Sequence, residues 1–137
     1  MKSKLLLTLL LTMTTMLKAE ISKDLQGSWI LDKAETRKEL KKNKVSDKSI
    51  EQAILRFENF SQAVTKDEVK ILMNQEPVIS FKFIKESKKE GLKTITVSTK
   101  RKEHHIDLTF IPKANGSYII KSSDTNDMDH YVWKKKQ

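Results

Sequence analysis

Cysteine is absent from this chain of 137 residues, and its absence excludes several kinds of protein. Without a thiol there can be no disulfide, no zinc–thiolate centre, no cysteine nucleophile and no cysteine-linked lipid. Glycine is nearly as scarce, because Gly27, Gly91 and Gly116 lie far apart and cannot build a phosphate-binding loop. The chain also lacks a Gly-x-Ser-x-Gly motif and a pair of carboxylates on an evident apolar face. We therefore expect neither an enzyme nor a protein with a bound cofactor.

The N-terminus has the pattern of a secretory signal peptide. Lys2 and Lys4 precede an apolar run over residues 5–17, and Ala19 is a small residue at which cleavage could occur. A membrane-spanning helix needs about 20 apolar residues, so an uncleaved anchor is the less favoured alternative. The sequence thus predicts a signal peptide, residues 1–19, and one exported domain, residues 20–137, that is periplasmic or secreted. We expect this domain to be a monomer without a membrane span after processing.

Two short helices are predicted near the start of the domain. Asp32 and Glu35 form a capping pair for a charged helix that begins at Lys33. Ser46 or Asp47 can cap a second helix, which we expect to cover an apolar surface as a lid or as a cover of the barrel's base. The helical insertion should span about residues 33–58. Four apolar residues recur on one face of the second helix, at i, i+3, i+4 and i+7: Ile50, Ala53, Ile54 and Phe57.

The rest of the domain alternates apolar and polar residues with a period of two. One such segment precedes the helices, at residues 27–31, and seven follow them. Pro77 is expected to interrupt the pattern, and residues 86–91 and Asn115-Gly116 to form turns. Such a series predicts a mainly β fold, an antiparallel up-and-down barrel of about eight strands with two helices between strands 1 and 2. The first strand should pair with the last, which leaves no open edge. The predicted interior, which could be solid core or ligand cavity, is Ile79, Phe81, Phe83, Ile95, Val97, Ile106, Leu108 and Phe110.

Gly27-Ser28-Trp29 opens the predicted barrel, with Trp29 as a large plug for one end and Gly27 allowing close approach of a neighbour. This motif, the helices after the first strand and the closing "DHYVWKKK" resemble the lipocalin-like (calycin) families. They are similar in particular to small exported bacterial proteins of uncharacterised function that begin G-x-W-x-L-D. The resemblance implies a lipocalin-like barrel that binds a small apolar or amphipathic molecule without catalysis. His130-Tyr131 and Trp133 stand where fatty-acid-binding members carry the Arg-x-Tyr pair that holds a carboxylate.

One cluster, residues 103–107, contains side chains suited to acid–base or metal chemistry. His104 and His105 are adjacent, and in a strand they point to opposite faces, so they cannot bind one metal ion together. His130 could supply a further ligand from another strand. The usual ligand spacing is missing, however, and we expect no metal site. These histidines are interpreted as surface or rim residues.

Lysine and arginine exceed aspartate and glutamate by nine charges, although Lys2, Lys4 and Lys18 fall in the predicted leader. The basic runs lie at residues 41–44, 85–89, 100–102 and 134–136. They favour solubility and edge protection, or alternatively a collar that meets an anionic envelope component or a protein partner. Nucleic acid is not expected, because an aromatic stacking platform is not evident. Two functions therefore remain: a hollow barrel with a small apolar ligand, or a solid-core interaction or inhibitor protein that acts through its basic surface.

Overall fold

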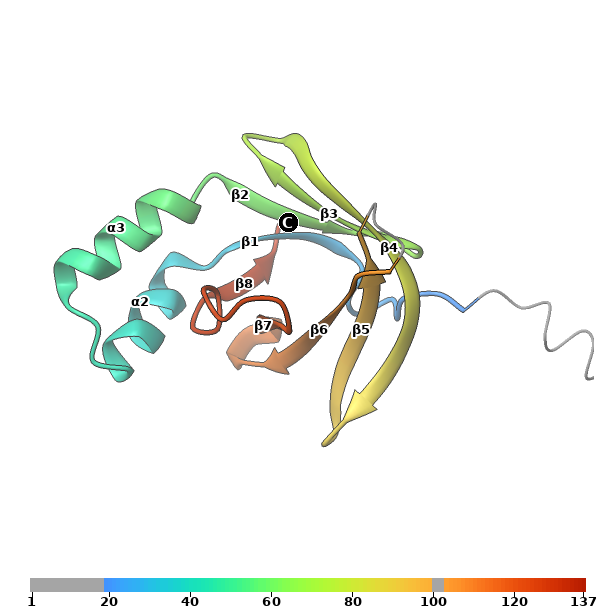
Figure 1. The fold of residues 1–137 in the computed structure, drawn as a ribbon. Helices are drawn as coiled ribbons and strands as arrows, with labels where there is room; N and C mark the ends of the chain where they lie inside the picture. The colour runs from blue at the N-terminus through green and yellow to red at the C-terminus, as the bar shows by residue number, and fades with distance from the viewer. Residues whose placement is uncertain (1–18, 100–102) are drawn as a thin grey trace, which may run out of the picture.

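A computed structural model describes residues 19–99 and 103–137, and this part of the chain forms a closed barrel of antiparallel strands (Figure 1). The predicted signal peptide, apart from Ala19, lies outside the described residues. Two helices, α2 (Lys33–Lys42) and α3 (Asp47–Phe57), lie between the first two strands. The strands of the barrel are β1 (Gly27–Leu31), β2 (Phe60–Val64), β3 (Glu68–Met73), β4 (Glu76–Lys89), β5 (Leu92–Ser98), β6 (His105–Pro112), β7 (Tyr118–Ser122) and β8 (Val132–Lys135).

Each strand pairs with the next one in the sequence, and β1 closes the ring by pairing with β8. Trp29 lies opposite Lys135, and Leu31 lies opposite Trp133. Closure satisfies the backbone groups that an open meander would leave on its edges. The mainly β class, the antiparallel eight-strand barrel and the position of the two helices are confirmed for the described part of the chain. Within that part, no helix is long and apolar enough to span a membrane.

The bounds predicted for β4 are wrong, because Pro77 lies inside the strand and residues 86–89 continue it. The register shifts between Ile71 and Leu72 opposite Pro77, and a proline without an N–H is tolerated at such a bulge. A second shift lies between Phe83 and Lys85. Bulges let a strand bend, and Figure 1 shows β4 curving through a wide arc.

The turns on both sides of β4 are two residues long. Asn74 and Gln75 join β3 to β4, and Glu90 and Gly91 join β4 to β5. All four have positive φ, as a two-residue hairpin with the handedness of the sheet requires. Asn115 and Gly116 lie in the turn between β6 and β7, where both also have positive φ.

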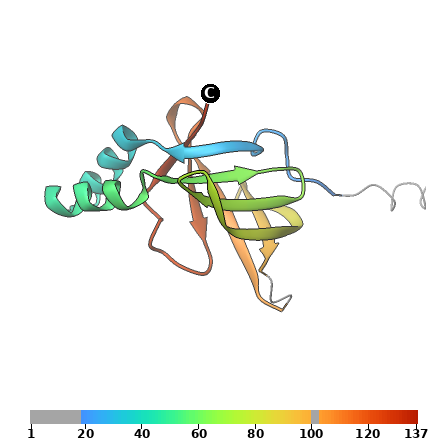
Figure 2. The ribbon, with the colours of Figure 1, turned by 90° about the horizontal axis from the view of Figure 1, so that it is seen from above.

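The helices begin at the predicted caps. Asp32 Oδ1 accepts a hydrogen bond from the backbone N–H of Glu35, and Ser46 Oγ accepts one from Ser49. Asn43 ends α2. Both ribbon views show the two helices together on one side of the barrel (Figures 1 and 2). In α3, Ile50 and Ile54 are buried, and Ala53 and Phe57 pack against the same core.

Thr36 anchors α2 to the barrel. Its hydroxyl accepts a hydrogen bond from the N–H of Val132 at 3.0 Å and faces the carbonyl of the same residue at 3.4 Å. The N–H of Asp32 also donates to the Val132 carbonyl, at 2.8 Å. The start of α2 is therefore bonded to the start of β8, which fixes the helix pair beside the strand that closes the ring.

Trp29 belongs to the core and is fully buried. Its indole N–H donates to the carbonyl of Leu25 at 2.9 Å, and the Tyr118 ring packs against it edge-on at 5.5 Å. Lys135 Nζ lies 5.4 Å from the centre of the indole ring. Gly27 has φ +139°, and a Cβ there would lie 3.4 Å from the Lys135 side chain. The glycine is thus required by a backbone conformation that other residues rarely adopt.

Candidate functional site

The inward faces of β2 to β7 line a partly open cavity of about 210 Å³, which we take as the candidate site. The loop between β7 and β8, residues 123–131, supplies the rest of its wall. The lining is mostly apolar, as small-molecule sites usually are. Its apolar members are Val69, Ile71, Ile79, Phe81, Val97, Ile106, Leu108, Ile120 and Met128, and its polar members are Gln62, Ser122, Asp124 and Thr125.

Two wider depressions, of about 450 and 550 Å³, differ from this cavity in their walls. The first involves Ser28 and Ile30, which alternate with the inward-pointing Trp29 and therefore lie on the outside of β1. The second includes charged residues from the β2–β3 turn and from β4, among them Asp67 and Lys82. Neither has the apolar, inward-facing lining of the cavity inside the barrel.

The structure brings five of the predicted interior residues together around the cavity: Ile79, Phe81, Val97, Ile106 and Leu108. Ile95 and Phe110 are fully buried in the core instead, and the Phe110 ring packs on Tyr118 at 5.8 Å. Phe83 is half-buried and packs against the core. Ile79 lines the cavity although 45% of the residue is exposed, which places it at the rim.

Among the described residues that line the cavity, none comes from α2 or α3. The four residues of the predicted lid or base cover, Ile50, Ala53, Ile54 and Phe57, pack on the core. The Phe57 ring lies 5.0 Å from the Tyr131 ring and 5.5 Å from the Phe60 ring. The segment that covers the cavity is the β7–β8 loop, through Asp124, Thr125 and Met128.

Gln62 is the polar residue that lies deepest in the lining. In the ladder it stands opposite Trp29 on one side and Ile71 on the other. It is 7% exposed, and among the described residues no hydrogen bond to its side-chain amide is found. In the described chain, one side-chain polar atom is both fully enclosed and without a partner, and it is the indole nitrogen of Trp133. The amide atoms of Gln62 are therefore not fully enclosed and can be reached from the cavity. An unpaired amide group therefore faces the apolar space.

The rim of the cavity is acidic rather than basic. Asp124 lines it, and His104 Nε2 lies 3.3 Å from Asp124 Oδ1. Both side chains are more than half exposed. No lysine or arginine belongs to the lining among the residues that the structure describes.

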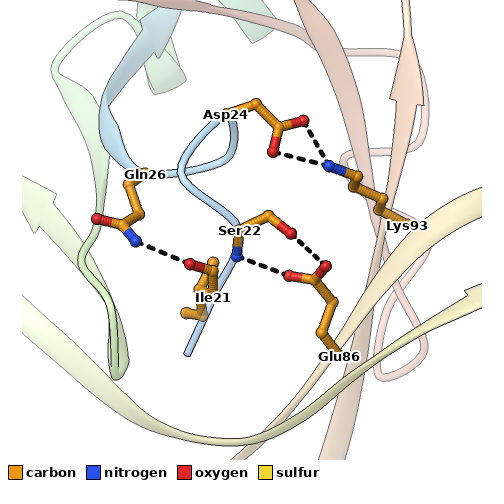
Figure 3. A network of polar contacts seen from close by, with 6 residues as sticks. All are labelled: Ile21, Ser22, Asp24, Gln26, Glu86 and Lys93. Atoms are coloured by element: carbon orange, nitrogen blue, oxygen red, sulfur yellow. Dashed lines mark hydrogen bonds and ion pairs between the residues drawn. The ribbon is translucent and has the colours of Figure 1, made fainter. Parts of the chain in front are cut away.

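A short N-terminal segment, residues 20–26, is hydrogen-bonded to the β2–β3 turn and to strands β4 and β5, and Figure 3 shows its contacts with Glu86 and Lys93. The Ile21 N–H donates to the Lys66 carbonyl at 2.8 Å, and Ile21 and Leu25 are fully buried. The Ser22 N–H and hydroxyl both donate to the Glu86 carboxylate. The sequence pattern did not reveal this segment, because seven residues without periodicity carry no strand or helix signal.

An ion pair between Asp24 and Lys93 also holds this segment against β5. Lys93 Nζ lies 2.7 Å from both carboxylate oxygens of Asp24. The hydrogen bond from Lys93 lowers the pKa of Asp24, and the same bond raises the pKa of Lys93. The side chains of this ion pair are partly exposed, so the pair fixes the position of the segment more than it adds to stability.

The three histidines do not come together. His104 is at the rim beside Asp124, His105 is exposed at the start of β6, and His130 is exposed in the β7–β8 loop. Within the described residues, no group of three or more His, Asp or Glu side chains could hold a metal ion. The Asp107 carboxylate accepts hydrogen bonds from Lys89 Nζ at 2.8 Å and from the Thr96 hydroxyl at 2.7 Å, and these bonds lower the pKa of Asp107.

In each of the three basic runs that the structure describes, one lysine has a partner within the protein. Lys89 pairs with Asp107, Lys41 lies 4.0 Å from Asp47, and Lys135 lies over Trp29. The run at 100–102 lies outside the described residues. Among the histidines, the basic runs and the alternating apolar residues that the sequence offered as functional features, the apolar residues are the ones that line a cavity together.

Comparison with known proteins gives no relative: no family model, curated protein or solved structure matches this chain.

Proposed function

We propose that this chain is an exported, non-catalytic binding protein of lipocalin-like type, whose barrel takes a small apolar or amphipathic molecule. The observation that carries the proposal is the cavity of about 210 Å³ inside the barrel, with nine apolar side chains in its wall. A closed barrel of eight strands can hold one small ligand in this way. The early Gly27-x-Trp29 motif and the helices after β1 support the lipocalin-like assignment.

The volume sets the size of the ligand. Liquid water takes about 30 Å³ per molecule, so this cavity corresponds to about seven non-hydrogen atoms. An engineered apolar cavity of about 150 Å³ in another protein binds benzene. The ligand, or the part of it inside the barrel, is therefore about as large as one substituted six-membered ring. A long acyl chain is too large to be enclosed.

The wall sets the strength of binding. Each buried carbon contributes about 0.8 kcal/mol, so a seven-carbon ligand gains about 5.6 kcal/mol. This corresponds to a dissociation constant of about 0.1 mM. Since the attraction comes from apolar burial, added salt should not weaken it, whereas binding through the lysine-rich surface would fall with ionic strength.

Methyl NMR on protein expressed from the full sequence, with toluene as the probe, tests the proposal. Toluene should shift the methyl signals of Ile79, Ile106 and Leu108 at about millimolar concentration, well above the expected constant. Ile50 and Ile54 in α3 are the internal control, because neither lines the cavity. Native mass spectrometry of gently purified protein would then identify any co-purified ligand. Absence of shifts at the three cavity residues would contradict the proposal and would favour a solid barrel that acts through its surface.

A further inference from the structure

The side chain of Gln62 differs from the other buried polar side chains of the described chain. Five polar residues are buried: Thr36, Gln62, Thr94, Thr96 and Ser117. The hydroxyls of the other four all have partners within the protein. Of these five, Gln62 alone has no hydrogen bond between its side chain and the described residues, although it is only 7% exposed.

The Gln62 amide is withdrawn from the protein surface and has no partner within the described protein, so it can be satisfied only by what occupies the cavity. Native proteins rarely keep such a group without a reason, and a binding site is one such reason. Gln62 lies in the lining of the apolar cavity, between Trp29 and Ile71 in the ladder. Its amide can both donate and accept, so it can pair with a group that does the same. A hydroxyl has this property.

The charges around the cavity exclude an anionic group as the best partner. The described lining contains one residue of a charged type, the acidic Asp124, and no basic one. A carboxylate inside the barrel would leave water without a cationic partner in that lining, which is costly. An uncharged group avoids this cost.

We propose that the cavity binds a small uncharged molecule with one hydroxyl group, and that Gln62 hydrogen-bonds this hydroxyl while the apolar wall encloses the carbon skeleton. This inference rests on the proposed function and names the ligand class for the same site. Gln62 is then the residue that determines specificity. A site built around a buried hydrogen-bonding group discriminates against analogues that cannot pair with it.

Phenol and toluene test the inference, because they have the same shape and differ by a hydroxyl in place of a methyl group. Their dissociation constants are measured by methyl NMR for the wild-type protein and for Gln62→Met, which keeps the length of the side chain and removes both hydrogen-bonding atoms. We expect Gln62→Met to weaken phenol binding relative to toluene binding by about tenfold, the effect of about 1.4 kcal/mol. Benzoate, the anionic analogue, should bind the wild-type protein more weakly than phenol.

Gln52→Met is the matched control, because it makes the same replacement at an exposed residue of α3 that does not line the cavity. It should leave the phenol-to-toluene ratio within about twofold of wild type. Gln62→Leu is a second variant in case the methionine perturbs the fold, and toluene binding reports that the cavity is intact. If both probes bind the wild-type protein and the ratio is unchanged in both Gln62 variants, the inference is overturned and the proposed function stands. If neither probe binds the wild-type protein, both are overturned.

Discussion

Trp29 and Trp133 are both fully buried in this barrel, and they differ in whether the indole N–H has a hydrogen-bond partner. The Trp29 indole N–H donates to the Leu25 carbonyl at 2.9 Å. The Trp133 indole N–H has no partner among the described residues. Both rings fill the interior, so their apolar contributions are similar, and the difference lies in the hydrogen bond. Leaving a buried donor or acceptor unpaired costs about 1–3 kcal/mol.

Replacing each tryptophan by phenylalanine should therefore have unequal effects. Trp29→Phe removes ring volume and also leaves the Leu25 carbonyl without its donor. Trp133→Phe removes similar volume but also removes an unpaired N–H, which offsets part of the loss. We expect Trp29→Phe to lower the free energy of unfolding by about 1–3 kcal/mol more than Trp133→Phe. Urea denaturation of both variants measures this, and equal losses would show that the Leu25 contact contributes nothing.

Most elements of the fold follow from local patterns, and the exceptions have identifiable causes. The α3 stripe and the caps at Asp32 and Ser46 depend on neighbours within one or two turns, so they were predictable. The extent of β4 was not, because a bulge tolerates Pro77 and a two-residue turn replaces the expected loop at 86–91. Bulges arise from pairing with other strands, and a single sequence does not show that pairing.

The candidate site was predictable only in part, for a similar reason. Alternation identified Phe81, Val97 and Ile106 as inward-facing, and they do line the cavity. It could not separate them from Phe110, which faces the same interior but is packed against Tyr118. Gln62 was missed, because a polar residue in an alternating strand is normally placed on the outer face. Its alternation with the buried Val64 was the signal that could have found it.

The N-terminal segment is the element whose contribution is easiest to test. Leu25 is fully buried, whereas Leu55 on α3 is 66% exposed. Leu25→Ala should lower the free energy of unfolding by about 2–5 kcal/mol, as expected for a buried leucine. Leu55→Ala is the control and should change it by less than about 0.5 kcal/mol. Similar losses in the two variants would mean that residues 20–26 are only loosely held against the barrel.

At the scale of the whole molecule, three carboxylates tie distant segments together. Asp24 bonds the N-terminal segment to Lys93 in β5, and Glu39 bonds α2 to Lys113 after β6. Asp107 bonds β6 to Lys89 in β4. The hydrogen bond from the lysine lowers the pKa of each carboxyl below its usual value, and for Asp107 the Thr96 hydroxyl adds to the effect. Each carboxylate therefore favours the folded state only while it is ionised.

The sign of the resulting pH dependence follows from the direction of these shifts. In the unfolded chain the three groups titrate near 3.8 or 4.5, and in the folded chain they titrate lower. Their contribution is complete above the unfolded values and is lost as the pH falls through the folded ones. Protonation also removes negative charge from a chain that already has a net charge of +9, which adds repulsion. The free energy of unfolding should thus be nearly constant from about pH 7 to 5 and then decrease towards pH 3.

Urea denaturation at a series of pH values, for the wild-type protein and Asp107→Asn, measures this dependence. The variant lacks one of the groups whose ionisation favours folding, so it should be less stable at neutral pH and should lose less stability on acidification. Asp47→Asn is the control, because its side chain is 88% exposed and lies 4.0 Å from Lys41. Its curve should follow the wild-type curve, since exposed pairs contribute little. If Asp107→Asn and the wild-type protein lose stability in parallel between pH 5 and 3, the bond between β6 and β4 is not linked to folding, and general charge repulsion accounts for the acid sensitivity.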